Sequence, residues 1–215
     1  MPIRVLIADD HSVVREGLRM IIDGFDGMTV VGEAIDGKEA IKMHEQLSPD
    51  VIIMDISMPM LNGIEATRII CKRNHDVKIV ILSMHLSREY VANAISAGAR
   101  SYLSKESSGV WVIKAIQAVT KGQFYFGPGI KAPPDFTLKK KQVNLKIPLE
   151  ILSQREREVL QLVVEGKTSR QVAEILFLSP KSIETYRSRL MNKLGVNSFS
   201  SLVKFAVSHG VTPPT

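Results

Sequence analysis

The chain has 215 residues, of which 45% are hydrophobic and 23% charged, a composition typical of one large or two small globular domains. No apolar run approaches the roughly 18 residues that a membrane span needs, and Asp9 follows the first apolar segment too early for a signal peptide. Cys71 is the only cysteine, which excludes an internal disulfide and favours a reducing, cytoplasmic setting.

The net charge of +6 is unevenly distributed along the chain. Residues 1–121 contain 14 Lys and Arg against 15 Asp and Glu, whereas residues 122–215 contain 14 against 7. A nearly neutral half joined to a basic half indicates two domains, of which the second faces a polyanion. Ordinary variation of surface charge would produce the same distribution, so that alternative stays open at this point.

Strand-like and helical segments alternate through the first half. The predicted strands cover residues 3–7, 29–34, 51–54, 77–82 and 101–103. The predicted helices lie between residues 13 and 24, 37 and 48, 64 and 73, 88 and 97, and 110 and 121. This strict alternation predicts an α/β domain over residues 1–121, with a five-stranded parallel sheet and helices on both faces.

Polar side chains follow the ends of several predicted strands. Asp55 comes directly after Val51–Met54, an apolar run without polar alternation that is typical of a strand buried on both faces. Right-handed crossovers place the carboxyl ends of all strands on one edge of the sheet, where α/β proteins bind ligands. The other polar residues expected at this edge are Asp9, Asp10, Ser83 and Lys105.

This set of residues suits phosphoryl transfer, which depends on positioning and on neutralising charge. Clustered carboxylates favour a hard divalent cation with oxygen ligands, such as Mg²⁺. Asp55 would attack the phosphorus atom, while Lys105 would neutralise charge and the Ser83 hydroxyl would bond a phosphoryl oxygen. Asp9, Asp10 and the backbone carbonyl of Ser57 would hold the Mg²⁺ ion. Taken singly, each residue also suits a turn, a helix cap or a solvated surface.

One set of motifs spans the first half: Asp9-Asp10, Asp55-x-x-Met58-Pro59-x-x-Asn62-Gly63, Ser83, and Gly98-Ala99-x-x-Tyr102-Leu103-x-Lys105. The set resembles the receiver domain of two-component response regulators, which has a flavodoxin-like fold. The resemblance implies that Asp55 accepts phosphate from a sensor histidine kinase. It also implies that Ser83 then moves toward the phosphoryl group and Tyr102 turns inward. Packing on a sheet edge is a plainer role for Tyr102.

One residue departs from the receiver pattern. Many receivers follow the lysine with a proline in a cis bond, whereas Glu106 follows Lys105 here. A cis bond before a residue other than proline is costly, so the loop after Lys105 is expected to differ from those receivers.

Residues 122–147 lose the hydrophobic periodicity and are predicted to form a linker. The aromatic patch Phe124–Phe126 is expected to pack against the last helix of the first domain. The run Lys139-Lys140-Lys141 is either solvated or adds nonspecific attraction to DNA phosphates.

Residues 148–215 are predicted to form an all-α domain. Ser153–Glu156 and Thr168–Gln171 have the capping-box pattern, and Ser179-Pro180 joins an N-cap serine to proline at the first helical position. A last helix is expected from about 198 to 209.

The second and third of these helices are joined by a tight turn, and the third is polar and basic on its free face. This arrangement is typical of a helix-turn-helix that reads DNA, although a small bundle with a solvated face would show the same spacing. Glu184, Thr185 and Ser188 would reach base edges in the major groove. The residues expected to hold phosphates are Lys181, Arg187, Arg189 and Lys193.

A second set of motifs covers this half: Leu152-Ser153-x-Arg155-Glu156-Arg157-Glu158-Val159-Leu160, Gly166-Lys167-Thr168, Ala173-x-x-Leu176-x-Leu178-Ser179, Ile183-Glu184-Thr185-Tyr186 and Lys193-Leu194-Gly195-Val196. It resembles the LuxR-type DNA-binding domain, and its union with a receiver is typical of the NarL/FixJ subfamily. The resemblance implies a homodimer through the last helix, with Val203 and Val207 as contacts, or through the final receiver helix. Relatives often carry lysine and histidine where this chain has Glu184 and Tyr186.

These expectations describe a phosphorylation-controlled transcription factor rather than an enzyme acting on outside substrates. Its expected partners are a sensor histidine kinase, double-stranded DNA and a second copy of the chain, with RNA polymerase as a further candidate and no membrane. A phosphohydrolase would need a second aspartate two residues after Asp55, where Ser57 stands. A flavodoxin-like cofactor binder would need a phosphate-cradling loop after the first strand, and none follows. A receiver that binds DNA without phosphorylation remains open.

Overall fold

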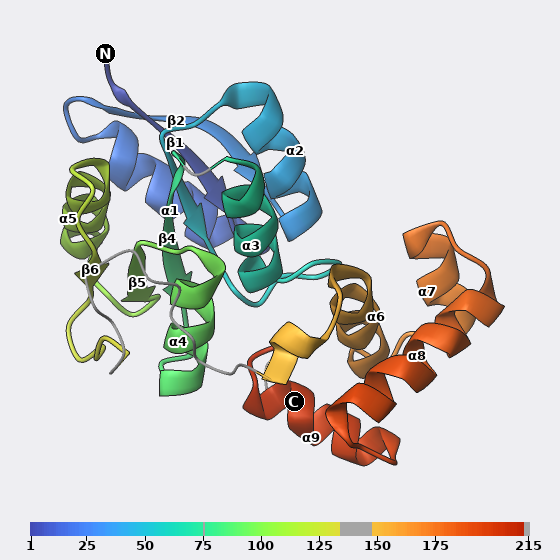
Figure 1. Cartoon of the computed structure of the whole chain (residues 1–215). Helices are drawn as coiled ribbons and strands as arrows, with labels where there is room; N and C mark the ends of the chain where they lie inside the picture. The colour runs from blue at the N-terminus through green and yellow to red at the C-terminus, as the bar shows by residue number, and fades with distance from the viewer. Residues whose placement is uncertain (75, 134–147, 213–215) are drawn as a thin grey trace. The chain divides into compact units, whose positions relative to one another are not determined.

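The structure is a computed structural model that describes residues 1–74, 76–133 and 148–212. It contains two compact units, Met1–Val143 and Asn144–Thr215. The first unit is built on a sheet, and the described part of the second is helical (Figure 1). None of the helices in the described residues is long and apolar enough to cross a membrane.

The sheet of the first unit has six strands in the order β2-β1-β3-β4-β5-β6, and every neighbouring pair is parallel. The direction of winding reverses between β1 and β3, so the crevice at a topological switch point lies just beyond the carboxyl ends of these two strands. The strands are β1 (Ile3–Ala8), β2 (Met28–Ala34), β3 (Val51–Met54), β4 (Lys78–Ser83), β5 (Ser101–Ser104) and β6 (Tyr125–Phe126).

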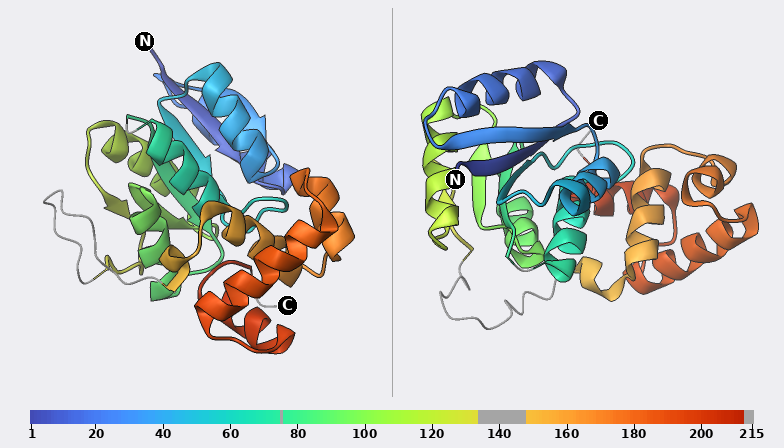
Figure 2. Two further views of the ribbon diagram at one scale, coloured as in Figure 1. Left: turned by 45° about the vertical axis from the view of Figure 1, so that its right-hand side comes forward. Right: turned by 90° about the horizontal axis from the view of Figure 1, so that it is seen from above.

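Five helices cover the two faces of this sheet, as Figures 1 and 2 show. The buried side chains of β3 explain the layers, since successive residues of a strand point to opposite faces. Val51 and Ile53 pack in the core with α1 and α5, whereas Ile52 and Met54 pack in the core with α2, α3 and α4. The helices are α1 (Ser12–Asp23), α2 (Gly37–Leu47), α3 (Gly63–Arg73), α4 (Arg88–Ala97) and α5 (Gly109–Thr120).

The sixth strand corrects the predicted number of five. Tyr125–Phe126 is too short to show strand periodicity and lies in the segment predicted as a linker. It pairs with β5 through the Tyr125 N–H, which donates to the Arg100 carbonyl at 3.1 Å, and the Gly127 N–H, which donates to the Tyr102 carbonyl at 3.0 Å. The aromatic patch was expected to pack against α5, and this is confirmed for Tyr125, which packs against the core that includes α5, whereas Phe124 and Phe126 pack against the core on the other face of the sheet. Lys139, Lys140 and Lys141 lie outside the described residues.

The second unit packs its helices around one apolar core. The predicted caps are present, since Ser153 and Thr168 form capping boxes and the Ser179 side chain accepts a hydrogen bond from the Ser182 N–H. Each such cap stabilises a helix end by about 1 kcal/mol. A short 3₁₀ helix, η1 (Pro148–Ile151), precedes the α-helices and was not predicted. The α-helices are α6 (Gln154–Val164), α7 (Ser169–Leu176), α8 (Pro180–Leu194) and α9 (Phe199–Ser208).

Candidate functional site

Two buried carboxylates meet at the crevice between β1 and β3. Asp9 follows β1 and is 1% exposed, and Asp55 follows β3 and is 2% exposed. The parallel register sets Ala8 beside Met54, and the Asp55 N–H donates to the Ala8 carbonyl at 2.8 Å. The strand pairing therefore continues one residue beyond the two strands and brings both carboxylates to one place.

Lys105 completes this cluster from the end of β5. Its ammonium lies 2.8 Å from Asp9 Oδ2 and 2.9 Å from Asp55 Oδ2. Its backbone N–H donates to the Ser83 carbonyl at 3.0 Å, which ties the loop after β5 to the end of β4. The peptide bond between Lys105 and Glu106 is trans, like every other bond in the described residues. The prediction that these strand-end residues share one edge is confirmed.

The electrostatics of the site follow from burial and from this ammonium. Burial raises the pKa of Asp55 above its usual value, and the Asp9 charge adds to that rise, while the Lys105 charge opposes it. Burial alone would lower the pKa of Lys105, but the charge of Asp55 and the hydrogen bonds to both carboxylates raise it. Lys105 therefore stays charged at neutral pH and holds two carboxylates that would otherwise repel each other.

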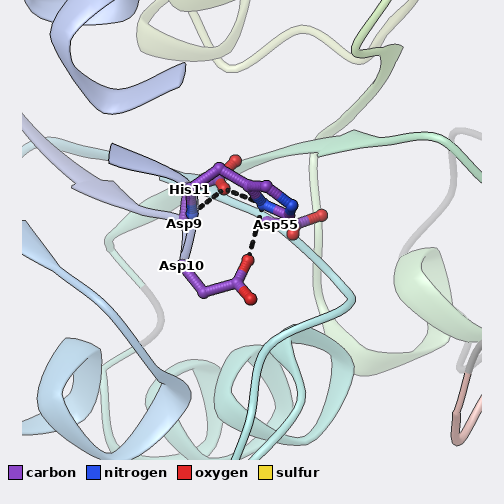
Figure 3. Close-up of side chains that lie close together, drawn as sticks. All are labelled: Asp9, Asp10, His11 and Asp55. Atoms are coloured by element: carbon purple, nitrogen blue, oxygen red, sulfur yellow. Dashed lines mark hydrogen bonds and ion pairs between the residues drawn. The ribbon is translucent and has the colours of Figure 1, made fainter. Parts of the chain in front are cut away.

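A fourth side chain, His11, joins the site although the sequence reasoning did not select it. Its Nδ1 atom lies 2.7 Å from Asp10 Oδ1 and 3.1 Å from Asp9 Oδ1, and Figure 3 shows the ring beside both carboxylates. Its backbone N–H also donates to Asp9 Oδ1 at 2.9 Å. The imidazole is 62% exposed and stands at the rim. The sequence signal that could have selected His11 is its position directly after Asp10.

The carboxylates fit a hard divalent cation. One ligand atom from each of Asp9, Asp10, His11 and Asp55 lies within 4.8 Å of the others. Apart from the Lys105 ammonium, the buried Oδ2 atoms of Asp9 and Asp55 have no polar partner among the described residues. Buried carboxylate oxygens with unused acceptor capacity are suitable ligands for such a cation.

The loop after β3 holds Asp55 by close backbone packing. The Asn62 side chain caps α3 by accepting from the Glu65 N–H at 2.9 Å, and the Gly63 N–H donates to the Ile56 carbonyl at 3.0 Å. A Cβ atom on Gly63 would lie 1.8 Å from the Asp55 carbonyl oxygen. Glycine is therefore required here, because the start of α3 touches the backbone of Asp55. The Ser57 N–H donates to Asp55 and lowers its pKa.

The two residues expected to switch lie beside this cluster, on β4 and β5. Ser83 and Tyr102 are both 0% exposed, and Tyr102 thus already points inward. The Tyr102 hydroxyl donates to the backbone carbonyl of His85, and the His85 N–H donates to Ser83 Oγ at 3.1 Å. His85, which sequence reasoning missed, lies in the loop between β4 and α4 and contacts both switch residues.

In the second unit, α7 and α8 form the predicted helix pair. The turn between them begins at Phe177, which adopts a left-handed conformation with φ of 54°. Five of the residues predicted to contact DNA are exposed on α8: Lys181, Glu184, Thr185, Ser188 and Arg189. The Thr185 hydroxyl donates to the Lys181 carbonyl at 3.0 Å, which leaves its methyl group free to contact a base.

Three of the predicted contact residues also have partners within the unit. The Lys193 ammonium lies 2.7 Å from Oε2 of the buried Glu156. Burial alone would raise the pKa of Glu156, but the hydrogen bonds from Lys193 and Ser153 lower it. Glu184 accepts a hydrogen bond from Ser169 and lies 3.5 Å from Arg187 Nη1. These contacts join α8 to α6 and α7, which sequence spacing did not indicate.

The residues predicted to mediate dimerisation, Val203 and Val207, lie on α9 and are half-buried. The same helix buries Leu202 and Ala206 in the core. Val203 and Val207 therefore keep part of their surface outside the core of this unit.

Comparisons with known proteins match both units. The model of the response regulator receiver domain covers residues 5–117, and that of the luxR family of bacterial regulatory proteins covers residues 150–206. The response regulator UvrY of Escherichia coli (strain K12) is 36% identical over 209 residues, which cover 97% of this chain and 95% of UvrY.

Two solved structures of the response regulator RcsB are also similar. One is RcsB of Salmonella enterica serovar Typhimurium, bound to a promoter in the presence of the phosphomimetic BeF₃⁻. It is 26% identical with a TM-score of 0.56, and the match covers 99% of this chain and 100% of that one. The other contains two RcsB dimers bound to two parallel DNAs. It is 28% identical with a TM-score of 0.57, covering 97% of this chain and 99% of that one.

Proposed function

This chain belongs to the response regulators of the NarL/FixJ subfamily, in which a receiver domain is joined to a LuxR-type DNA-binding domain, and we propose that phosphorylation of Asp55 controls its binding to DNA. The observation that carries this proposal is the convergence of Asp9, Asp55 and Lys105 at the switch point of the sheet. The proposed phosphate donor is a sensor histidine kinase.

In the proposed step, a phosphoryl group is transferred from an oxygen or nitrogen atom of the donor to a carboxylate oxygen of Asp55. A carboxylate oxygen of Asp55 forms a bond to phosphorus while the bond from phosphorus to the donor's leaving atom breaks and its electron pair departs with that atom. The product is an acyl phosphate on Asp55. Lys105 lies within ion-pair distance of the attacking carboxylate and would neutralise part of the charge that arrives.

The proposed cofactor is Mg²⁺, held by Asp9, Asp10, Asp55 and the backbone carbonyl of Ser57. When bound, the ion would neutralise charge on the phosphoryl oxygens and orient them. The hard carboxylate donors and their unused acceptor capacity support this assignment.

The proposed output is a change in dimerisation and in sequence-specific DNA binding that regulates transcription in the cytoplasm. Glu184, Thr185 and Ser188 would contact base edges, and Val203 and Val207 on α9 would join two copies. Phosphate contacts are proposed for Lys181, Arg187, Arg189 and Lys193, although Arg187 and Lys193 would share their charge with acidic partners in the same unit. RNA polymerase is a further proposed partner.

We do not propose an enzyme acting on outside substrates. A phosphohydrolase would need an acid–base group beside the phosphoryl site, and the position two residues after Asp55 is Ser57. Slow hydrolysis of the acyl phosphate would restore the unphosphorylated state and is part of the proposed switch.

The proposed function is tested by Asp55→Asn in the full chain. With Mg²⁺ and a small phosphodonor such as acetyl phosphate, the wild type should gain the mass of one phosphoryl group, and the variant should gain none. Wild-type binding to a DNA site selected from a random pool should strengthen with phosphodonor, and that of the variant should not change.

Glu45→Gln is the matched control, because Glu45 is an exposed carboxylate on α2, away from the strand ends. It should be labelled like the wild type. Full labelling of Asp55→Asn would refute the acceptor assignment. Wild-type DNA binding that ignores the phosphodonor would favour a receiver that acts without phosphorylation.

A further inference from the structure

His85 has more polar contacts with the switch region than its place in a loop would suggest. It lies between the exposed residues Met84 and Leu86 but is itself half-buried. Its Nε2 atom lies 3.1 Å from Ser57 Oγ, and its ring stacks on Tyr90 with a centroid distance of 4.7 Å and an angle of 16°. The side chain therefore joins the loop that follows β3 to the start of α4.

The backbone of His85 contacts the two switch residues. Its N–H donates to Ser83 Oγ at 3.1 Å, and its carbonyl accepts the hydrogen bond of the Tyr102 hydroxyl. Tyr102 is fully buried, so its hydroxyl needs a partner, and the loss of this carbonyl would cost free energy. The Tyr102 hydroxyl also has a hydrogen bond with the Ser83 side chain, so its inward position depends both on Ser83 and on where the loop between β4 and α4 places the His85 carbonyl group.

We propose that His85 is a positioning residue. Its imidazole, anchored on Ser57 and Tyr90, holds the loop where the His85 carbonyl keeps Tyr102 inward before any phosphoryl group arrives. The proposal rests on the proposed function of Asp55. It adds that contacts of His85 favour the inward position of Tyr102 already in the unphosphorylated protein.

The physical basis is a population shift. A ligand that requires one conformation binds more weakly in proportion to the fraction of molecules that adopt it. Removal of the imidazole would free the loop, expose Tyr102 in part of the molecules and lower the affinity for a phosphoryl mimic. A net hydrogen bond contributes on the order of 1 kcal/mol, so the expected loss is about fivefold.

The test measures beryllofluoride affinity and the labelling rate with acetyl phosphate, both with Mg²⁺ in the full chain. His85→Ala should lower both about fivefold. It should also make Tyr102 reactive to nitration, mapped by peptide mass spectrometry, whereas the wild type should be protected there. His85→Gln can still reach Ser57 with an amide and should restore most of the affinity. Leu86→Ala, a change in an exposed neighbour, should leave all three readouts unchanged.

A double-mutant cycle with Ser57→Ala separates positioning from a general loss of stability. If His85 acts through Ser57, the double variant should lose little more than either single variant. Additive losses, or a His85→Ala variant with wild-type affinity and a protected Tyr102, would overturn the proposal. Should His85→Ala fail to fold, His85→Gln and Ser57→Ala decide the question alone. A wild type that takes no beryllofluoride and no label would instead refute the proposed function of Asp55.

Discussion

Asp55 carries its charge in a place that folding almost closes to water. Burial and the Asp9 charge raise its pKa, while Lys105 only partly compensates. A buried carboxylate beside another negative charge is suited to accept a phosphoryl group. In the unphosphorylated protein, however, its ionised form lowers the free energy of unfolding. Sites that bind or react often carry such a cost.

Asp55→Asn should therefore stabilise the protein at neutral pH, by about 1 kcal/mol. The pKa of Asp55 is higher in the folded than in the unfolded chain, so folding favours its protonated form. In the wild type, Asp55 therefore stabilises the fold most at a pH below its pKa in the unfolded chain. This stabilisation is lost as the pH rises through the pKa of Asp55 in the folded chain. The advantage of the variant should consequently grow from acid to neutral pH. Urea unfolding across this pH range measures it, and a variant less stable than the wild type at pH 7 would contradict the expectation.

Gly63 shows that a residue without a side chain also shapes the site. Gly63→Ala would set a Cβ atom 1.8 Å from the Asp55 carbonyl oxygen, so the backbone of Asp55 or of α3 would have to shift. We expect a loss of about 3 kcal/mol in the free energy of unfolding, together with slower phosphorylation of Asp55.

Gly17→Ala is the matched control for Gly63→Ala. Gly17 lies within α1, and, apart from the neighbouring backbone of that helix, a Cβ atom there would meet no heavy atom of the described residues within 4 Å. Alanine should then raise the free energy of unfolding by about 0.5 to 1 kcal/mol, because glycine is the weaker helix former. Equal effects of the two substitutions would show that close packing at Gly63 does not matter.

At the scale of elements, α8 is held by two neighbours while one face stays exposed. Lys193 pairs with Glu156 of α6, and Arg187 donates to Ser169 of α7 at 3.1 Å. These contacts fix how the helix is presented. They also make the two basic residues less suitable as freely moving phosphate contacts than Lys181 and Arg189, which are exposed.

Thr185 offers the sharpest test of base reading on this helix. Because its hydroxyl donates to the Lys181 carbonyl, its methyl group is the part free to contact a base such as thymine. Thr185→Ala should reduce discrimination between selected and random DNA about tenfold, with little change in nonspecific affinity.

Lys181→Ala is the comparison for Thr185→Ala. It should weaken binding to all sequences alike and reduce the slope of log K against log salt by about 1. Titrations of both variants at several salt concentrations separate the two roles. An equal loss on every DNA sequence for Thr185→Ala would assign Thr185 to the phosphate contacts instead.

At the scale of the whole molecule, the chain offers two candidate surfaces for joining two copies. One is the face of α9 with Val203 and Val207. The other is an apolar pocket between α1 and α5, whose rim includes the exposed Val110 and Phe25. A dimer matters because one recognition helix reads too few bases for specific binding.

We expect the α9 surface to join the DNA-binding domains. Val207→Asp should weaken dimerisation of the phosphorylated protein by roughly tenfold or more, since an unpaired charge would be buried at the contact. Val110→Asp places the same charge on the rival surface and should have little effect. Sedimentation of both variants with beryllofluoride distinguishes the surfaces, and the reverse order of effects would move the contact to α5.

Local patterns were sufficient for most of the architecture. The apolar run before Asp55 predicted a strand buried on both faces, and the capping boxes at Ser153 and Thr168 predicted two helix starts that the structure contains. The strand-end rule then predicted that Asp9 and Lys105 lie at the same edge as Asp55, because right-handed crossovers place the carboxyl ends of parallel strands on one edge. These signals are local, so a sequence displays them directly.

Other features depended on contacts between distant segments. The strand β6 exists because β5 offers an open edge, and two residues are too few for periodicity to reveal. The inward turn of His85 between two exposed neighbours depends on Ser57, Tyr90 and Tyr102, which lie in three other segments. The sequence by itself thus determined the order of elements and the identity of the acidic site. Only the tertiary structure decided which side chains surround that site, because side-chain partners are selected by packing in space rather than by spacing along the chain.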